Sequence, residues 1–360
     1  MDASARPVPS PRDLFSVRLS RTAEIAAALP QLLGFRPRES LVLVALAEPD
    51  GGRVGLTVRV DLPPEDDAPA VARLLAEKVC TDDPRGVVVA VVSDDPDDVS
   101  GGPDLPHRRL VWEVVTALAR HSVVVPETLL VRAGRWWSYD CPRPCCEPGE
   151  GTPLPHGVTA LEAAAVVDGT AVAGSREELA GRLGWPPGSD RRAMARVSTR
   201  IAGECAAAIA EHGFDAFAEA SWNAVTAALA RCRPQAAAPV LSDDDVARIL
   251  WGLRDVAVRD RALELALGPD APAAELLWTE CTRRGLAPLD AAPATLLAVS
   301  AWLRGDGAMA NIALARALDS RPDYVLATLL AEGLARCLPP TELRTMIRAS
   351  LDGCGVDRVR

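Results

Sequence analysis

Hydrophobic and polar positions near the start of the chain switch between helical and strand spacing. Apolar residues recur at helical intervals over residues 25–33, and Gly34 ends that pattern. Residues 40–47 then form a continuous apolar run, which is typical of a buried strand. Residues 54–61 alternate between apolar and polar side chains, so they predict a second strand with one wetter face. The Pro-Asp-Gly-Gly turn at residues 49–52 predicts that the two strands form a hairpin.

This succession of predicted helices and strands continues to about residue 155. The elements predicted next are helices over residues 67–79 and 106–121 and strands over residues 86–93, 128–133 and 136–139. Helices inserted between strands are typical of parallel crossover units. Residues 1–155 are therefore predicted to be an α/β domain, with a mixed sheet of about five strands and flanking helices.

Strand signals stop after Pro155, and helical patterns take over. Residues 175–178 and 242–245 both have the pattern of a capping box, in which a serine is followed three residues later by an acid and a helix begins. Glycines and prolines interrupt the helical pattern at short intervals. We predict an all-helical C-terminal half in two parts, residues 156–235 and residues 240–360, joined by a linker.

The second helical part is predicted to consist of antiparallel helical hairpins. Residues 310–324 match half of a tetratricopeptide signature, but the period of about 34 residues is not sustained. Trp251, Trp278 and Trp302 recur about once per helix or hairpin. We interpret them as buried anchors, and an exposed aromatic groove is the alternative.

Composition and charge narrow the classes of partner. The chain is 49% hydrophobic and 24% charged, which is typical of a globular protein, and its net charge of −10 disfavours nucleic acid. No apolar run reaches the ~18 residues of a membrane span, and the polar N-terminus lacks the apolar core of a signal peptide. We therefore expect a cytoplasmic protein with a protein partner and no membrane. Its nine cysteines are expected to be free in that reducing compartment.

The first candidate site is the segment over residues 134–156, which has the most unusual composition in the chain. Cys141, Cys145 and Cys146 place three thiols within six residues, and His156 follows ten residues later, so four potential zinc ligands are present. Their spacing lacks a Cys-x2-Cys knuckle and a second half-site, and two adjacent cysteines are not expected to point at one tetrahedral ion. Packed thiols, a metal site and a redox pair all remain open.

The second candidate site is the carboxyl edge of the predicted parallel strands. Asp61 and Asp94 lie at the ends of two of these strands, with Arg59 and Arg135 expected nearby. Such carboxylates could hold a hard cation such as magnesium. The two aspartates would have to lie on adjacent strands to share an ion. A solvated acidic turn over residues 94–98 is the alternative interpretation.

The predicted strand directions relate these two candidates. If residues 128–133 run parallel to the preceding strand and residues 136–139 return, Arg135 starts near the carboxyl edge. Cys141 then lies at the opposite edge, roughly 15 Å away. The cysteines and the aspartates are therefore predicted to form two separate sites.

A third candidate is the arginine row Arg192, Arg196 and Arg200, spaced four apart on a predicted helix over residues 190–212. A phosphate-bearing partner could bind there. Lys78 is the only lysine in the chain, so the arginine excess reflects a GC-rich coding bias, and a solvated face is the alternative. The sequence contains no glycine-rich phosphate loop, nucleophile elbow or dinucleotide fingerprint.

Several motifs, in this order, resemble a known family. They are Leu32-Leu33-Gly34-Phe35-Arg36-Pro37, Arg59-Val60-Asp61-Leu62-Pro63, Gly134-Arg135-Trp136-Trp137-Ser138-Tyr139, Glu150-Gly151-Thr152-Pro153 and Pro322-Asp323-Tyr324. In this combination the chain resembles, over nearly its whole length, the actinobacterial family described as domain of unknown function 4192. The resemblance implies a high-GC actinobacterial source. It carries no activity, cofactor or catalytic residue that can be transferred.

Three functions of different classes remain open. The first is a non-enzymatic interaction or regulatory protein, which binds another protein through its helical half. The second is a ligand-binding protein or an enzyme that uses the α/β domain. The third is a metal- or redox-responsive protein that uses the cysteine cluster. No catalytic residue is assigned, and zinc and magnesium are the two metals considered.

Overall fold

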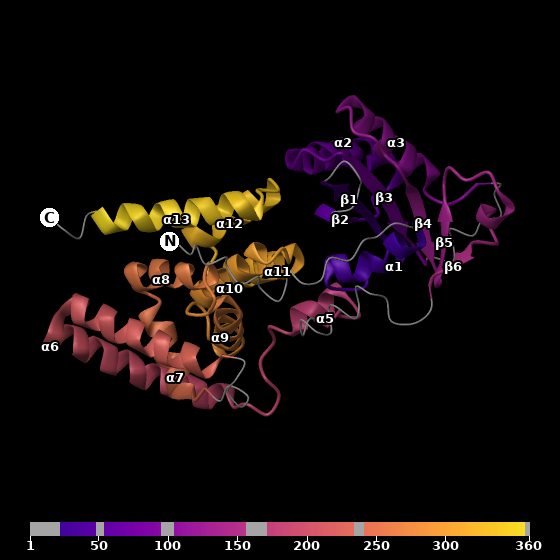
Figure 1. Cartoon of the computed structure of the whole chain (residues 1–360). Coiled ribbons are helices and arrows are strands. Elements are labelled where there is room, and N and C mark those ends of the chain that lie inside the picture. The colour runs from indigo at the N-terminus through magenta and orange to yellow at the C-terminus, as the bar shows by residue number, and fades with distance from the viewer. Residues whose placement is uncertain (1–21, 48–53, 95–103, 156–170, 234–240, 357–360) are drawn as a thin grey trace, which may run out of the picture. The chain divides into compact units, whose positions relative to one another are not determined.

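The structure is a computed structural model that describes residues 22–47, 54–94, 104–155, 171–233 and 241–356 (Figure 1). The chain divides into two compact units, Met1–Arg176 and Glu177–Arg360. The first unit is an α/β domain and the second is helical, as the sequence predicts. The first unit extends beyond residue 155, because Ala173 forms a parallel bridge with Phe35.

Six strands form one sheet in the first unit. They are β1 (Ser40–Leu46), β2 (Val54–Asp61), β3 (Gly86–Val92), β4 (Thr128–Arg132), β5 (Arg135–Ser138) and β6 (Thr152–Pro153). Their order is β2-β1-β3-β4-β5-β6, with β3 and β4 parallel and the other neighbours antiparallel. The hairpin of β1 and β2 and the parallel crossover from β3 to β4 agree with the prediction. The sequence analysis missed β6, because two residues are too short to carry a pattern.

The position of each strand follows from its sequence. β1 and β3 are continuous apolar runs in the middle of the sheet, and Leu41, Leu43 and Val89 there are fully buried. The alternating strand β2 lies at the edge and is half-buried. The N–H of Leu56 on this edge strand donates to Asp82 Oδ2 at 2.9 Å, so it finds an acceptor outside the sheet.

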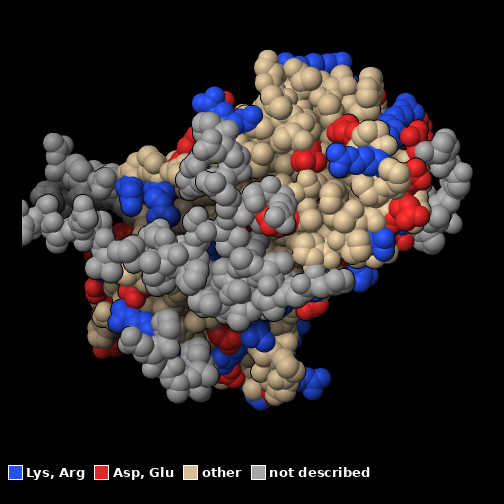
Figure 2. Space-filling model, turned by 45° about the vertical axis from the view of Figure 1, so that its right-hand side comes forward, with Lys and Arg blue, Asp and Glu red and all other residues tan. Residues whose placement is uncertain are grey.

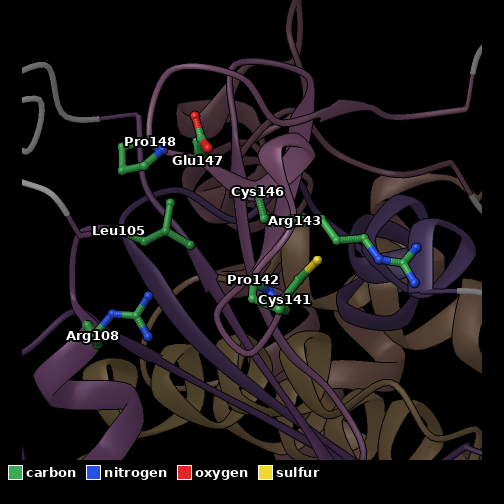
Figure 3. Close-up of a pocket in the computed structure, with 8 residues that line it drawn as sticks. All are labelled: Leu105, Arg108, Cys141, Pro142, Arg143, Cys146, Glu147 and Pro148. Atoms are coloured by element: carbon green, nitrogen blue, oxygen red, sulfur yellow. The ribbon is translucent and has the colours of Figure 1, made fainter.

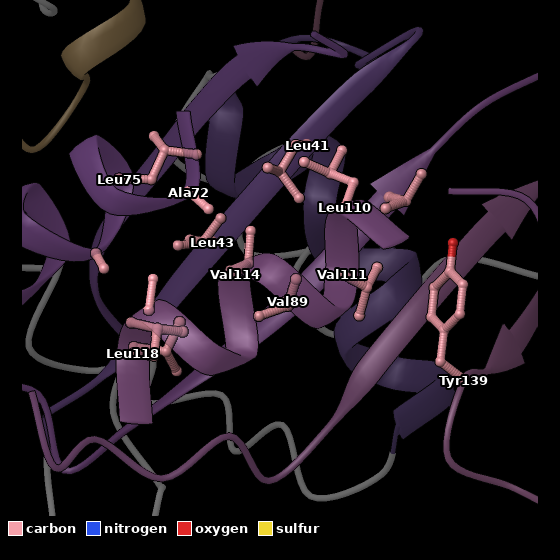
Figure 4. Packing of buried hydrophobic residues seen from close by; sticks show 14 of the residues in the cluster. Leu41, Leu43, Ala72, Leu75, Val89, Leu110, Val111, Val114, Leu118 and Tyr139 are labelled. Atoms are coloured by element: carbon pink, nitrogen blue, oxygen red, sulfur yellow. The ribbon is translucent and has the colours of Figure 1, made fainter. Parts of the chain in front are cut away.

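Helices pack on the sheet through single apolar stripes. In the described ranges of this unit, the α-helices are α1 (Thr22–Leu33), α2 (Ala68–Val79) and α3 (Arg108–Arg120). α2 and α3 pack together on the face of the sheet that carries Leu41, Leu43 and Val89 (Figure 4). Leu75 of α2 and Val114 of α3 are buried in that cluster. Such a stripe recurs at helical spacing, which is why the sequence pattern predicts both helices.

The second unit consists of helices separated by glycine and proline breaks. They are α5 (Arg176–Gly181), which begins at the border, α6 (Arg191–Arg231), α7 (Asp243–Gly252), α8 (Val256–Leu263), α9 (Ala271–Arg284), α10 (Ala291–Leu303), α11 (Gly307–Ser320), α12 (Val325–Ala335) and α13 (Pro340–Val356). α6 is kinked at Gly213, whose φ of 83° and ψ of 173° are not helical, so it comprises two helices, and the first ends close to the predicted end at residue 212. The predicted capping box of Ser242 and Asp245 is present at the start of α7.

The helix α10 lies at the centre of the second unit. Twelve of its 13 residues are buried, and Trp302 donates from Nε1 to Leu338 O at 3.1 Å. Trp278 is fully buried, while Trp251 is half-buried and donates to Ser198 O at 3.0 Å. The three tryptophans are therefore packing anchors, as predicted, and they do not form an exposed groove.

Candidate metal centre

The loop after β5 brings the three clustered thiols together. Residues 139–151 lead the chain from β5 to β6. The Sγ atoms of Cys141, Cys145 and Cys146 all lie within 4.8 Å of one another, and those of Cys145 and Cys146 are 4.0 Å apart. Four-coordinate zinc with Zn–S bonds of about 2.3 Å separates its sulfurs by roughly 3.8 Å. The cluster therefore has about the size of a zinc–thiolate site.

Two adjacent cysteines were not expected to point at one tetrahedral ion, yet in this loop the two neighbouring sulfurs lie 4.0 Å apart. Cys145 and Cys146 lie in a single 3-10 turn, Pro144–Cys146. Neighbouring side chains of a 3-10 helix diverge by about 120°, whereas those of a strand point to opposite sides. Both thiols can therefore turn toward Cys141, which precedes the turn.

The residues around the cysteines hold the loop in shape. Arg135 donates from Nε to Glu150 O at 2.7 Å and from Nη2 to Gly151 O at 2.8 Å. Trp137 donates from Nε1 to Glu147 O at 3.1 Å. Gly151 has a φ of 68°, and a Cβ there would lie 2.3 Å from the Trp137 ring, so the loop requires glycine at this point. Arg135, which was expected to face the aspartates, binds this loop instead.

The other side of the loop is tied to α3 and β4. Tyr139 donates from its hydroxyl to Pro106 O at 2.7 Å, and Arg108 Nη1 donates to Tyr139 O at 3.0 Å. The Arg108 guanidinium also lies 5.7 Å from the centre of the Tyr139 ring. Asp140 accepts a hydrogen bond from Thr128 Oγ1 at 2.7 Å. The unusual composition of this segment is thus explained as a frame around the cysteines.

The three thiols have different surroundings. Cys145 is exposed, Cys141 is half-buried and Cys146 is buried. Burial raises the pKa of Cys146 to about 11, although the N–H of Ser138 donates to its sulfur at 3.4 Å. The pKa of Cys141 is lowered, first by a hydrogen bond from the backbone of Arg143 and then by the neighbouring thiols and the Arg143 charge. Cys141 therefore ionises more readily than Cys146.

A pocket of about 160 Å³ adjoins two of the thiols (Figure 3). Its wall includes Cys141 and Cys146, together with the side chains of Arg108 and Glu147. Figure 3 shows Arg108 and Arg143 on opposite sides of the cysteines, with Arg143 extending away from Arg108. The lining of the pocket therefore combines two thiols with two arginines, Arg108 and Arg143, and one carboxylate, that of Glu147.

The aspartates of the second candidate lie on strands that are not neighbours. β1 separates β2, which ends at Asp61, from β3, which Asp94 follows two residues later. The expectation of adjacent strands is wrong because β1 pairs antiparallel with both of them. Asp61 forms an ion pair with Arg59 at 2.6 Å, and Asp94 Oδ1 accepts from the N–H of Ala133 at 2.7 Å. A joint magnesium site would need the adjacency that this sheet lacks.

Glu39, which the sequence analysis did not single out, joins the same edge. It precedes β1 with a φ of 38°, which is uncommon for a residue other than glycine. Its carboxylate accepts from Ser93 Oγ and from the N–H of Asp94, both at 2.7 Å, and its carbonyl accepts from Leu62 N at 2.9 Å. The side-chain partners are 54 and 55 residues away in the sequence, so no local pattern indicates this role.

The strand directions agree with the prediction. β3 and β4 run parallel, and β5 returns antiparallel to β4. The N–H of Tyr139 donates to the carbonyl of Thr128 at the beginning of β4, whereas Ala133, beyond its other end, contacts Asp94. The cysteines therefore follow the edge of the sheet opposite to Asp94, and the two candidates are separate.

Two guanidinium groups of the arginine row on α6, those of Arg196 and Arg200, contact carboxylates. Arg192 donates its backbone N–H to Asp190 at 2.8 Å, and the Arg196 guanidinium lies 3.6 Å from the same carboxylate. Arg200 pairs with Glu204, one turn further along α6. On the face shown in Figure 2, basic and acidic side chains are interspersed. These contacts support a solvated face of ion pairs more than a phosphate-binding surface.

The remaining metal-binding residue types do not extend the cluster in the part of the chain that the structure describes. His156 lies outside the described residues, so its role as a ligand stays a prediction. Cys232 and Cys281 are buried in the second unit, where burial raises the pKa of both thiols. These two cysteines are packing residues.

Comparison with known proteins identifies a family. A family model described as a domain of unknown function (DUF4192) matches residues 23–341, which is most of the chain. No curated protein and no solved structure matches. Within the described ranges, no helix is both long enough and apolar enough to cross a membrane. The matched region includes the cysteine loop with its frame, the Glu39 edge and the helices up to the start of α13, and the chain belongs to the DUF4192 family.

Proposed function

We propose that this protein is a metal-responsive regulatory protein whose α/β unit binds one soft divalent cation, zinc by preference, through Cys141, Cys145 and Cys146. The observation that carries the proposal is the convergence of the three sulfur atoms within 4.8 Å on a loop held by its neighbours. Thiols that only filled a core would all be buried, yet Cys145 is exposed.

The chemistry of the donors favours a soft ion. Thiolates select zinc, copper(I) and iron–sulfur centres, whereas magnesium and calcium prefer oxygen ligands. Backbone N–H groups of Ser138 and Arg143 donate to the sulfurs of Cys146 and Cys141, and such bonds favour the thiolate form that a metal requires. Three protein ligands leave one position of a tetrahedral ion for another group, as in zinc sites that exchange ligands.

Metal binding would act on the conformation of the loop. In the metal-free protein the pKa of Cys146 is about 11, so this thiol is protonated near neutral pH. Thiols form only weak hydrogen bonds with one another. A cation that links the three sulfurs would join Cys141 to the turn and stiffen the loop that Tyr139 ties to Pro106. The helical hairpins of the second unit would provide the surface for a protein partner.

Metal content is the first test. We expect the full chain, purified under reducing conditions, to contain about one zinc ion per molecule by elemental analysis. Cys145→Ser should remove the ion without disturbing the core, because Cys145 is exposed. Cys80→Ser changes a thiol of the same unit outside the cluster and should retain the ion. A wild-type chain that takes up no zinc, or a C145S variant with unchanged content, would contradict the proposal.

A thiol redox pair is the second candidate. The lowered pKa of Cys141 beside two other thiols favours it. Cys141 would attack oxidised glutathione and release one glutathione thiolate, and Cys145 or Cys146 would then displace the second to form a disulfide. We expect the metal-free protein to lose two titratable thiols in this reaction and zinc to protect them. Unchanged thiol content after long exposure would exclude this candidate.

We propose further that the protein works in the reducing cytoplasm of a high-GC actinobacterium. The eight cysteines whose side chains the structure describes are all free thiols, and a thiolate metal site requires that state. Labelling of intact cells with a thiol-reactive probe should modify Cys145. A fully oxidised cluster in freshly opened cells would count against this setting.

A further inference from the structure

The pocket beside the thiols bears on what completes the coordination of the bound ion. We infer that the fourth ligand of a cation at Cys141, Cys145 and Cys146 is the carboxylate of a small organic acid, which Arg108 holds in the pocket. This inference rests on the proposed metal site and names the class of ligand that completes it.

The arrangement of the sulfurs directs the fourth position toward the pocket. In the described ranges of the chain, the donor group contains three sulfurs and no fourth ligand atom. Cys141 and Cys146 both line the pocket, so an ion bound to these two sulfurs borders that space. Tetrahedral zinc with three protein ligands keeps its fourth position for an exchangeable group. A ligand would therefore reach the ion from the pocket (Figure 3).

Arg108 determines the charge and shape of that ligand. Its Nη1 donates to Tyr139 O at 3.0 Å, and its Nε pairs with Asp104 at 3.0 Å. Among the described residues these contacts engage Nη1 and Nε, which leaves the Nη2 hydrogens for a ligand. A guanidinium matches a carboxylate in shape as well as in charge. A carboxylate can thus place one oxygen on the ion and the other on Arg108.

The remaining wall of the pocket favours an organic acid over an inorganic anion. Leu105, Pro142 and Pro148 contribute carbon surface to the same pocket. Its volume of about 160 Å³ is far above the ~10–15 Å³ that a cavity needs to hold one water molecule. A short hydrocarbon chain can cover that apolar wall, whereas phosphate or sulfate has no apolar part. The fitting class is therefore a small carboxylic acid.

The carboxylate of Glu147 is the alternative to an external acid as fourth ligand of the ion. Glu147 lines the pocket and directly follows Cys146, so a different side-chain rotamer would make it the protein's own fourth ligand. Its carboxylate is not part of the donor group in this structure. As a negative charge beside the site, it also weakens the binding of an external carboxylate. The two roles predict opposite results for Glu147→Gln.

Cobalt(II) in place of zinc makes the fourth ligand visible, because its visible absorption depends on coordination. We expect acetate to change the spectrum of the full-length cobalt protein saturably, and neutral acetamide to leave it unchanged. Arg108→Gln should weaken acetate binding by about 10–100-fold, the value of a charge-assisted hydrogen bond, with unchanged cobalt stoichiometry. Arg109→Gln removes the same charge from the next residue of α3, which pairs with Glu65, and should bind acetate normally.

The remaining outcomes separate this inference from the proposed function. Tighter acetate binding by Glu147→Gln supports the inference. A changed spectrum of Glu147→Gln or His156→Ala without acetate overturns it, because the protein then supplies its own fourth ligand. Cobalt that binds to wild type but ignores acetate also overturns it and leaves the metal site standing. A chain that binds no cobalt contradicts both.

Discussion

The polar side chains at the two ends of the β4–β5 hairpin differ in the partners that they bind. At the turn end, Glu39, Ser93 and Asp94 bind one another and the N–H of Ala133, so their hydrogen bonds are made within the protein. At the other end, surrounding residues hold three thiols together. Cys145 and Cys146 contact each other only weakly, at 4.0 Å, and the thiols accept hydrogen bonds from backbone N–H groups of Ser138 and Arg143. A group of side chains that satisfies itself stabilises the fold. A group that is held in place with its own ligand atoms available is organised for a ligand.

The largest effect is expected from Gly151→Ala, which attacks the frame of the cysteine loop. The added Cβ would lie 2.3 Å from the Trp137 ring at a φ of 68°, so the loop must move. Zinc affinity should fall by about 10–100-fold and the free energy of unfolding by ~1–3 kcal/mol. Zinc titration and thermal unfolding measure both quantities. Gly149→Ala is the matched control, since its Cβ meets nothing within 4 Å. Equal behaviour of the two variants would show that the frame does not shape the site.

Arg135→Gln is expected to have the next largest effect. It removes the bonds to Glu150 O and Gly151 O and leaves the sheet in place. Zinc affinity, measured by competition with a coloured chelator, should fall about tenfold. The Glu39 edge should keep its contribution to stability. Normal zinc affinity in the Arg135→Gln variant would show that another residue, for instance Trp137, holds the loop in shape without Arg135.

Glu39→Ala tests the opposite end of the hairpin. Removing this carboxylate takes away the acceptor of one hydrogen bond from the Ser93 hydroxyl and one from the Asp94 N–H, so the protein should lose ~1–3 kcal/mol of stability. Zinc affinity should stay unchanged. Denaturant unfolding provides the measurement, and Glu65→Ala, an exposed partner of Arg109, is the control with little expected effect. A loss of zinc affinity in Glu39→Ala would mean that the two ends are coupled.

The smallest effect is a dependence of stability on alkaline pH. Burial raises the pKa of Cys146 from 9.0 to about 11, so folding favours its protonated form. That contribution is complete below pH 9 and is lost as the pH rises toward 11. Thermal unfolding of the metal-free protein should therefore show a decline over this range that Cys146→Ser lacks. Saturating zinc should abolish the decline, because the metal-bound sulfur has already lost its proton.

Sequence patterns predicted the elements whose causes lie close together in the chain. The apolar runs of β1 and β3, the break at Gly213 and the capping box at Ser242 each depend on neighbouring residues. The insertion of β1 between β2 and β3 depends on which strand pairs with which, and the wrong expectation for Asp61 followed from it. One local signal could have placed β2 at the edge of the sheet. Apolar and polar residues alternate in β2, whereas β1 and β3 are continuous apolar runs.

The sequence predicted only part of the candidate site, because the site also depends on contacts between separate segments. Three nearby cysteines were evident, but their convergence depends on the turn that starts at Pro144 and on bonds from Arg135 and Trp137. The role of Glu39 was hidden, since its side-chain partners come from a strand end 54 residues away. Contacts between distant segments are set by tertiary packing, and a single sequence carries no local trace of them.

The short span of the thiol cluster has a consequence for how a bound ion would act. Cys141 and Cys146 are separated by only four residues, Pro142 to Cys145. Closing so small a loop removes little conformational entropy from the unfolded chain, in contrast to a cross-link between remote segments. An ion there would contribute little to global stability through the unfolded state. It could bind and leave while the domain stays folded, which suits a reversible signal better than a permanent cross-link.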